Sequence, residues 1–258
     1  MLFAKLMRFT LLTIFVCVNS AYAKAGSLHP RTAGFPLETV KTKCIELTGI
    51  RIGGASDDVA DCRVSEFGTL GTFKNHTYYY AIYCLIPSYS INEGTCASGT
   101  FNAEYHKARA LAVFIGDEAT KAPQLLLERA EPEIGTVWYE RPEIVTNAVG
   151  TFLHLPIHLD GTGAGNMSRY YLWDEKAADW QSVESESWTK DLQIPAGLSI
   201  NKGIWPNLKN MSAEAYLYRA KDANCCPTGG TALIKLKIED RRFVVKSLTF
   251  NLEENKKQ

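Results

Sequence analysis

The cysteines are the residues with the clearest chemistry in this sequence. Six of the seven lie beyond residue 23, at Cys44, Cys62, Cys84, Cys96, Cys225 and Cys226. An even set of cysteines in an exported chain is typical of disulfide bonds. Proximity along the chain favours Cys44–Cys62 and Cys84–Cys96. Cys225 and Cys226 then bond to each other, or one of them reaches back to the first half. We expect no free thiol in the mature chain.

The segment from Asp222 to Gly230 reads DANCCPTGG and is the most distinctive string in the sequence. Pro227 fixes one backbone dihedral, and the two glycines at its end permit positive φ. Asp222 and Asn224 can bond to nearby backbone amides, so the string predicts a rigid turn with a mainly structural role. The alternative is an exposed contact point for a ligand or partner, formed by Asn224, Cys225, Cys226, Pro227 and Thr228. A thiol-exchange site is disfavoured, because such sites separate their cysteines by two residues at a helix start.

His154, His158 and Asp160 are metal-ligating residue types on one face of a predicted strand. Residues four apart on a strand lie about 13 Å apart, which is too far for both to bind one ion. The pattern favours a polar face that is solvated or paired, and we expect no metal and no other cofactor. The glycine-rich segment 161–165 precedes another predicted strand rather than a helix, which argues against nucleotide binding.

The sequence assigns no catalytic residue. Ser187 with Lys190, and Ser199 with Lys202, have the spacing of the nucleophile motif in penicillin-recognising enzymes. The composition of the chain predicts about one such match by chance, and the Lys-Thr-Gly strand of those enzymes is missing. Neither a Gly-x-Ser-x-Gly elbow nor a His-Glu-x-x-His helix occurs.

The string Asn224-Cys225-Cys226-Pro227-Thr228-Gly229-Gly230 resembles a turn in a family of exported, mostly uncharacterised bacterial proteins, where it precedes a C-terminal hairpin. The likeness extends more loosely over about Gly150 to Phe250. It includes the turn Gly161-Thr162-Gly163 and the segment Ile194-Pro195-Ala196-Gly197-Leu198. The resemblance implies a bacterial envelope protein, and it implies no activity because the family has none assigned.

Residues 1–23 have the pattern of a secretory signal peptide. Lys5 and Arg8 flank the apolar stretch from Phe9 to Val18, and Ala21-Tyr22-Ala23 fits a cleavage site. The stretch is well short of the roughly 20 residues that span a membrane. We therefore expect a periplasmic or secreted protein with no membrane span.

The balance of charge narrows the class of partner. Lysines and arginines number 28, and so do aspartates and glutamates. This balance argues against a nucleic-acid partner and against attachment to an anionic lipid surface. A protein or glycan of the cell envelope remains the expected partner.

Alternation with period two dominates the sequence and predicts an all-β fold with little helix. Thr151 to Asp160 predicts a half-buried strand, and Pro156 places it at a sheet edge. Tyr170 to Val183 and Thr231 to Leu252 predict hairpins, the second with its turn at Asp240-Arg241. Further strands are expected at 77–85 and 108–115, and one or two helical turns within 117–131. The hairpins would form an antiparallel sandwich or an irregular propeller-like sheet assembly.

The mature chain, 24–258, is expected to be a single β-rich domain with subregions 40–120 and 143–258. Aromatic residues gather in its predicted strands. Tyr79 and Tyr83 share one face of their strand, opposite Tyr78 and Tyr80. Core packing is the favoured interpretation, and a flat binding surface is the alternative.

These observations favour an exported protein with a non-catalytic binding role or an envelope-associated structural role. The alternative is an envelope hydrolase acting on glycan or peptide, which would need a nucleophile, a base and oxyanion donors converging in a pocket.

The signal-peptide pattern makes a direct prediction. Cleavage after Ala23 leaves Lys24 as the mature N-terminus, and the protein fractionates with the periplasm or the medium. Intact-mass analysis of the protein from the envelope fraction measures this. A mass that includes residues 1–23 would contradict it.

Overall fold

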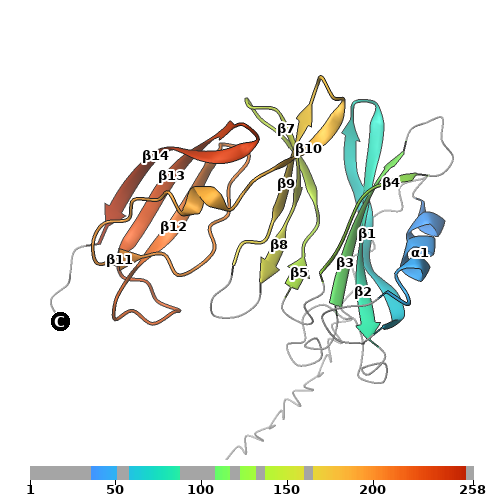
Figure 1. Ribbon diagram of the computed structural model, residues 1–258, viewed down its shortest axis with the longest axis horizontal. Coiled ribbons are helices and arrows are strands. Elements are labelled where there is room, and N and C mark those ends of the chain that lie inside the picture. Colours follow the sequence, from blue (N-terminus) through green and yellow to red (C-terminus); the bar gives the residue numbers. More distant parts are fainter. Residues whose placement is uncertain are drawn as a thin grey trace, which may run out of the picture. The chain divides into compact units, whose positions relative to one another are not determined.

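A computed structural model describes residues 36–50, 58–87, 108–116, 123–131, 137–159 and 165–253. The predicted signal peptide, Cys96 and Asp160 lie outside these ranges. The described part of the chain is mostly β, with 59% of its residues in strands, one short α-helix and four antiparallel sheets, one of them curled into a half-barrel. The predicted all-β class is confirmed (Figure 1). In the described part of the chain, every helix is too short or too polar to cross a bilayer.

The N-terminal sheet consists of four strands in sequence order, each antiparallel to the next: β1 (Val59–Phe73), β2 (His76–Pro87), β3 (Ala108–Gly116) and β4 (Gln124–Glu131). Strand β2 is buried on both faces. Tyr79 and Tyr83 join the cluster on one face, whereas Tyr78 and Tyr80 join the cluster on the other. The predicted division of these rings between two faces, and their role in the core, are therefore confirmed.

Helix α1 (Leu37–Glu46) covers one face of this sheet and was not predicted from the sequence. Val40, Cys44 and Leu47 have the spacing of one helix face, and all three are buried against β2 and β3. The hydroxyl of Tyr83 donates to the carbonyl of Val40 over 3.2 Å. The predicted Cys44–Cys62 disulfide is present and links the helix to β1.

Strand β4 corrects a second expectation. A helical turn was expected within 117–131, but residues 124–131 pair with β3 from Ile115 back to Arg109. Leu126 and Leu127 pack into the cluster on the sheet face opposite the helix. The run of leucines does not distinguish helix from strand by itself, and the pairing with β3 decides between them.

The middle of the chain forms two small sheets. One pairs β5 (Val137–Tyr139) with β8 (Ile157–Leu159), and the other has the order β10 (Asp179–Val183), β9 (Arg169–Asp174), β7 (Thr151–Leu155), β6 (Glu143–Thr146). The strand expected over 151–160 is therefore two strands, divided at Pro156. Strand β7 is central rather than at an edge, and all five of its residues are buried. Proline interrupts the ladder, so the chain changes sheets at that position.

The C-terminal sheet has the order β11 (Leu198–Ser199), β12 (Ser212–Arg219), β13 (Gly230–Glu239), β14 (Arg242–Leu252). Both predicted hairpins are confirmed, because β9 pairs with β10 and β13 pairs with β14. Asp240 and Arg241 have φ of 48° and 58°, as a two-residue hairpin turn requires. The buried face of the sheet packs on the short helix η2 (Ser187–Thr189) and on Phe152 and Tyr170.

The Cys44–Cys62 bond predicts a measurable loss of stability when it is removed. It joins residues 18 positions apart, and closing a loop of that size is worth about 3 kcal/mol. We expect Cys44→Ala with Cys62→Ala to lower the free energy of unfolding in urea by about 2–4 kcal/mol. Ile45→Ala is the control, because Ile45 is on the same helix and 71% exposed. An unchanged free energy in the double variant would contradict the prediction.

Candidate functional site

The solvent face of the C-terminal sheet carries three aligned rows of side chains. Buried residues alternate along β12 and β13, and Leu248 and Phe250 of β14 pack against the same core, so the residues between them face outward. Cross-strand pairing sets the rows. We call the whole set the Tyr216 face; its rows are Tyr216, Thr231 and Asn251; Glu214, Leu233 and Thr249; and Ser212, Lys235 and Ser247.

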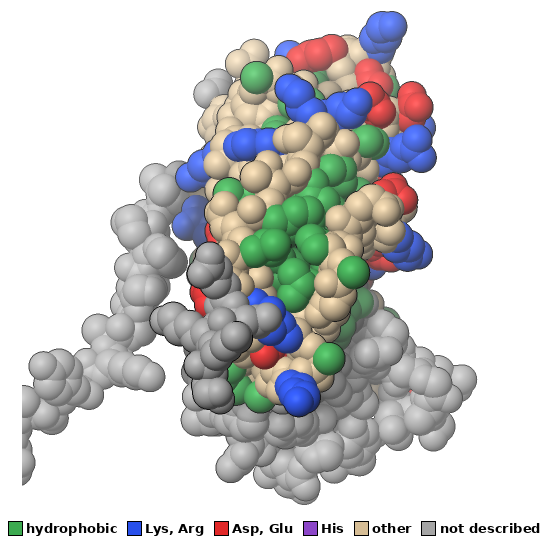
Figure 2. Space-filling model, turned by 90° about the vertical axis from the view of Figure 1, so that its left-hand side faces the viewer, with side chains coloured by type: hydrophobic (Ala, Val, Ile, Leu, Met, Phe, Trp, Pro, Cys, Tyr) green, Lys and Arg blue, Asp and Glu red, His purple; other side chains and the backbone are tan. Residues whose placement is uncertain are grey.

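Two large apolar side chains of this face are exposed. Tyr216 is 59% exposed and Leu233 is 41% exposed. They are diagonal neighbours, because Tyr216 pairs with Thr231 and Glu214 pairs with Leu233. Figure 2 views the molecule from the side on which β11–β14 lie in Figure 1. It shows hydrophobic side chains gathered at the centre of that view, with charged side chains around them.

The DANCCPTGG segment connects β12 to β13 and lies at one end of this face. Its fold depends on the carboxylate of Asp222, which accepts hydrogen bonds from the backbone N–H of Arg219 at 2.7 Å and of Thr228 at 2.8 Å. The hydroxyl of Thr228 donates to the other carboxylate oxygen over 2.7 Å. These bonds hold the pKa of Asp222 below its ordinary value, chiefly through the Arg219 amide.

The side chains of Tyr218 and Arg219, at the end of β12, also hold the segment by hydrogen bonds. The Arg219 guanidinium donates to the carbonyl of Thr228 at 3.1 Å and to that of Glu253 at 2.6 Å. The Tyr218 hydroxyl donates to the carbonyl of Asn224 at 3.0 Å. Tyr218 is two residues from Tyr216 on β12 but only 1% exposed. The segment therefore contacts the residue next to Tyr216 on the same side of the strand, and it borders the face there.

The two glycines at the end of the segment are each required, but for different reasons. Gly230 has φ of 97°, and a Cβ there would lie 2.0 Å from the carbonyl oxygen of Asn251. Gly229 is needed for close approach instead, because its Cβ would lie 2.6 Å from the carbonyl oxygen of Leu217. The predicted tight connection is thus explained, although positive φ is needed only at Gly230.

The predicted contact residues of the segment lie together on the surface. Asn224, Cys225, Cys226 and Thr228 are exposed, and Pro227 is half-buried. Cys225 and Cys226 are joined to each other, with their Cα atoms 3.8 Å apart. Cys84 also takes part in a disulfide, but Cys96 lies outside the described residues.

Sequence reasoning missed the Tyr216 face. The signal was available in SAEAYLYR, which alternates small buried residues with Glu214 and Tyr216. Alanine is not a strong strand former, so the string predicts a strand only weakly. The exposure of Tyr216 depends on where the sheet is covered, which no local pattern specifies.

The histidines form pairs with glutamates. His154 Nδ1 lies 3.0 Å from Oε1 of Glu143, and His158 Nε2 lies 3.4 Å from Oε1 of Glu140. The His154 ring stacks on Tyr170 with 4.6 Å between centroids. Its hydrogen bond to Glu143 lowers the pKa of that carboxyl group. Both histidines are therefore paired, but they do not share one strand face as predicted, because they lie on β7 and β8 in different sheets, and His154 is buried rather than solvated.

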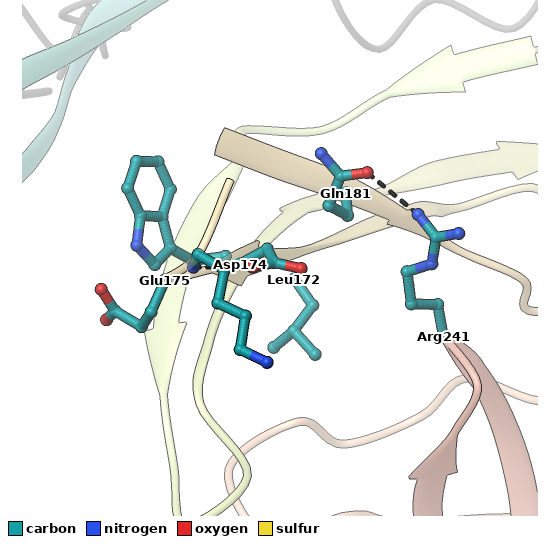
Figure 3. Close-up of a pocket in the computed structure, with 7 residues that line it drawn as sticks. Leu172, Asp174, Glu175, Gln181 and Arg241 are labelled. Atoms are coloured by element: carbon teal, nitrogen blue, oxygen red, sulfur yellow. Dashed lines mark hydrogen bonds between the residues drawn. The ribbon is translucent and has the colours of Figure 1, made fainter. Parts of the chain in front are cut away.

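Figure 3 shows an open pocket at the β9–β10 hairpin, where Gln181 and Arg241 point toward each other. Arg241 donates to the Gln181 side-chain oxygen over 2.9 Å. The Asp174 carboxylate accepts from the amides of Lys176 and Ala177, and Glu175 pairs with Lys74 at 2.8 Å. The polar groups of this pocket are engaged in holding the hairpin, so the pocket is a weaker candidate than the Tyr216 face.

The serine motifs do not form a nucleophile site. The Ser187 hydroxyl donates to Glu184, whose carboxylate also accepts from the Ser187 amide at 2.8 Å. The Ser199 hydroxyl bonds to the side-chain oxygen of Asn201 at 2.9 Å. Within the described ranges, no cluster of three or more His, Cys, Asp or Glu side chains is arranged to hold a metal ion.

The role of Asp222 makes a local prediction. Asp222→Ala removes the acceptor of three hydrogen bonds, so amide hydrogen exchange over 219–230 should become at least about tenfold faster. In the unaltered protein the same amides should lose protection in strong acid, below the usual pKa range of aspartate. A lowered pKa means that these bonds are present above that range and are lost as the pH falls.

The matched control is Asp191→Ala, because Asp191 is also an exposed aspartate. It should leave exchange over 219–230 unchanged. Equal protection in Asp222→Ala and the unaltered protein, measured by mass spectrometry, would show that the carboxylate does not hold the segment.

No protein-family model matches the chain, and a search of curated proteins found no match. The resemblance to exported bacterial proteins stays a prediction.

Proposed function

We propose that this chain is an exported, non-catalytic binding protein that contacts its partner through the Tyr216 face. The observation that carries the proposal is the exposure of Tyr216 and Leu233 as neighbours on an otherwise polar sheet face. An exposed aromatic ring beside an aliphatic side chain gives a partner apolar area to bury, and tyrosine is enriched among the residues that dominate binding energy.

The rigidity of the site supports the proposal. Tyr216 pairs with Thr231 of β13, and the end of the same strand pairs with β11 through Tyr218 and Arg219. The neighbouring segment is held by Asp222, Arg219 and Tyr218. A site that is ordered before binding loses little conformational entropy when the partner arrives.

The hydrolase alternative has weaker support. It requires a nucleophile beside a general base. Among the described residues, the Nε2 atoms of His154 and His158 are buried and hydrogen-bond to no nucleophile, and the Ser187 and Ser199 hydroxyls are bonded to other side chains. The expected location is the periplasm or the medium, and the expected partner is a protein or glycan of the cell envelope.

Capture of envelope components by the immobilised mature chain tests the proposal. Tyr216→Ala with Leu233→Ala should reduce the captured material at least about tenfold, because the loss of a dominant aromatic contact costs 2 kcal/mol or more. Both residues face solvent, so thermal stability should change little.

The control is Leu125→Ala with Val149→Ala. These residues are 45% and 44% exposed, so the control removes similar apolar side chains from other strands and loops. It should capture as much as the unaltered protein. Equal capture by all three proteins would reject the Tyr216 face as the contact surface.

A further inference from the structure

The spacing of the rows on the Tyr216 face suits an extended ligand. Its three rows run across β12, β13 and β14, and each row places one side chain from each strand side by side. Neighbouring strands lie about 4.8 Å apart, close to the length of one hexose unit in a β-linked chain. A chain lying along a row would therefore present one ring for each strand that it crosses.

The first row combines stacking with hydrogen bonding. Tyr216 offers the face of an aromatic ring, on which the C–H groups of a pyranose can pack. Thr231 lies beside it on β13, and Asn251 follows in the same row on β14. Their hydroxyl and amide groups can donate and accept hydrogen bonds, as a polyhydroxylated ligand requires.

Leu233 adds an apolar position next to the ring. It is 41% exposed and diagonal to Tyr216, with Glu214 and Thr249 on either side in the second row. A single aliphatic side chain among polar neighbours suits a small apolar substituent better than a large apolar surface. The methyl group of an acetamido substituent has that size, and its amide can bond to Asn251 or Thr231.

The charges of the face favour a neutral ligand. Its nine residues include one acidic and one basic side chain, Glu214 and Lys235. A polyanion would require clustered lysines and arginines. A stable protein interface buries about 800 Å² per partner around an apolar centre, and only Tyr216 and Leu233 are apolar among these nine residues.

The Cys225–Cys226 segment bounds one end of the face. The Tyr218 hydroxyl is bonded to Asn224, and Tyr218 is 1% exposed although Tyr216 is 59% exposed. The segment therefore forms a wall beside the Tyr216 row, with Asn224, Cys225 and Cys226 exposed on it. A ligand on the first row would contact this wall with its edge.

From this geometry we infer that the Tyr216 face binds a β-linked chain of N-acetylated hexosamine units. The inference rests on the proposed function and specifies its ligand class. Tyr216 stacks on one sugar ring, Leu233 receives an acetamido methyl group, and Thr231 and Asn251 bond to the polar groups of the rings that lie over β13 and β14.

Titration calorimetry of the full mature chain with two hexasaccharides tests the inference. Chitohexaose carries acetamido groups, and cellohexaose has the same linkage without them. Chitohexaose should bind at least about tenfold more tightly, because one buried methyl group with a hydrogen bond is worth more than 1.4 kcal/mol.

Single-residue variants test which side chains contact the sugar. Tyr216→Ala should weaken chitohexaose binding at least about tenfold, whereas Tyr216→Phe keeps the ring and should stay within about threefold of the unaltered protein. Leu233→Ala should reduce the preference for chitohexaose over cellohexaose. Leu125→Ala is the control for an exposed leucine elsewhere and should change neither affinity.

Three outcomes overturn the inference: no binding of chitohexaose at millimolar concentration, equal binding of the two sugars, or binding that Tyr216→Ala does not weaken. If envelope capture still depends on Tyr216 and Leu233 while chitohexaose does not bind, the ligand class is wrong and the proposed function stands. If capture is also independent of these residues, both the inferred ligand class and the proposed function are wrong.

Discussion

The structure depends on strand β7, whose five residues are all buried because both of its faces are covered. Leu153 and Leu155 pack into the cluster that includes Tyr78 and Leu111 of the N-terminal sheet. Phe152, on the other face, packs into the cluster that includes Leu217 and Ile234 of the C-terminal sheet. Full burial of side chains of this size contributes about 1.5–3 kcal/mol each. The strand thus connects the two large cores of the described chain.

The burial of β7 has a consequence for its histidine, of which one ring nitrogen is bonded and the other, Nε2, is buried without a hydrogen-bond partner. His154 faces the C-terminal side of β7 and would lose its hydration there without a partner. Glu143, directly across from it on β6, supplies one hydrogen bond, and the Tyr170 ring covers its face. Burial of a polar group is tolerated when it is bonded. These residues are therefore best understood as parts of the core rather than as reactive groups.

The C-terminal sheet combines a packed face with an open one. Its inner face is held by the core around Trp188 and Phe152, and its outer face carries the Tyr216 rows. The connection between β12 and β13 could have been a loose loop. Instead, the side chains of Asp222, Arg219 and Tyr218 hold it by hydrogen bonds, and its two adjacent cysteines are joined by a disulfide. The most distinctive string of the sequence and the most exposed aromatic ring of the sheet therefore lie at the same end of one surface.

The sequence by itself determined the features that depend on near neighbours. The hairpins 170–183 and 231–252, the strands around Tyr80 and Leu111, the division of the β2 tyrosines between two faces and the Cys44–Cys62 pairing follow from alternation, turn residues and proximity along the chain. Helix α1, the strand identity of residues 124–131 and the break at Pro156 were decided only in the tertiary structure. Each depends on which distant strand or face the segment meets. The same distinction holds for the candidate site. The residue types around Cys225 and Cys226 predict the turn from the sequence alone. The exposure of Tyr216 and the burial of Tyr218, in contrast, depend on which segments cover the sheet. Side-chain period is a local property, but solvent exposure is set by contacts between residues far apart in sequence.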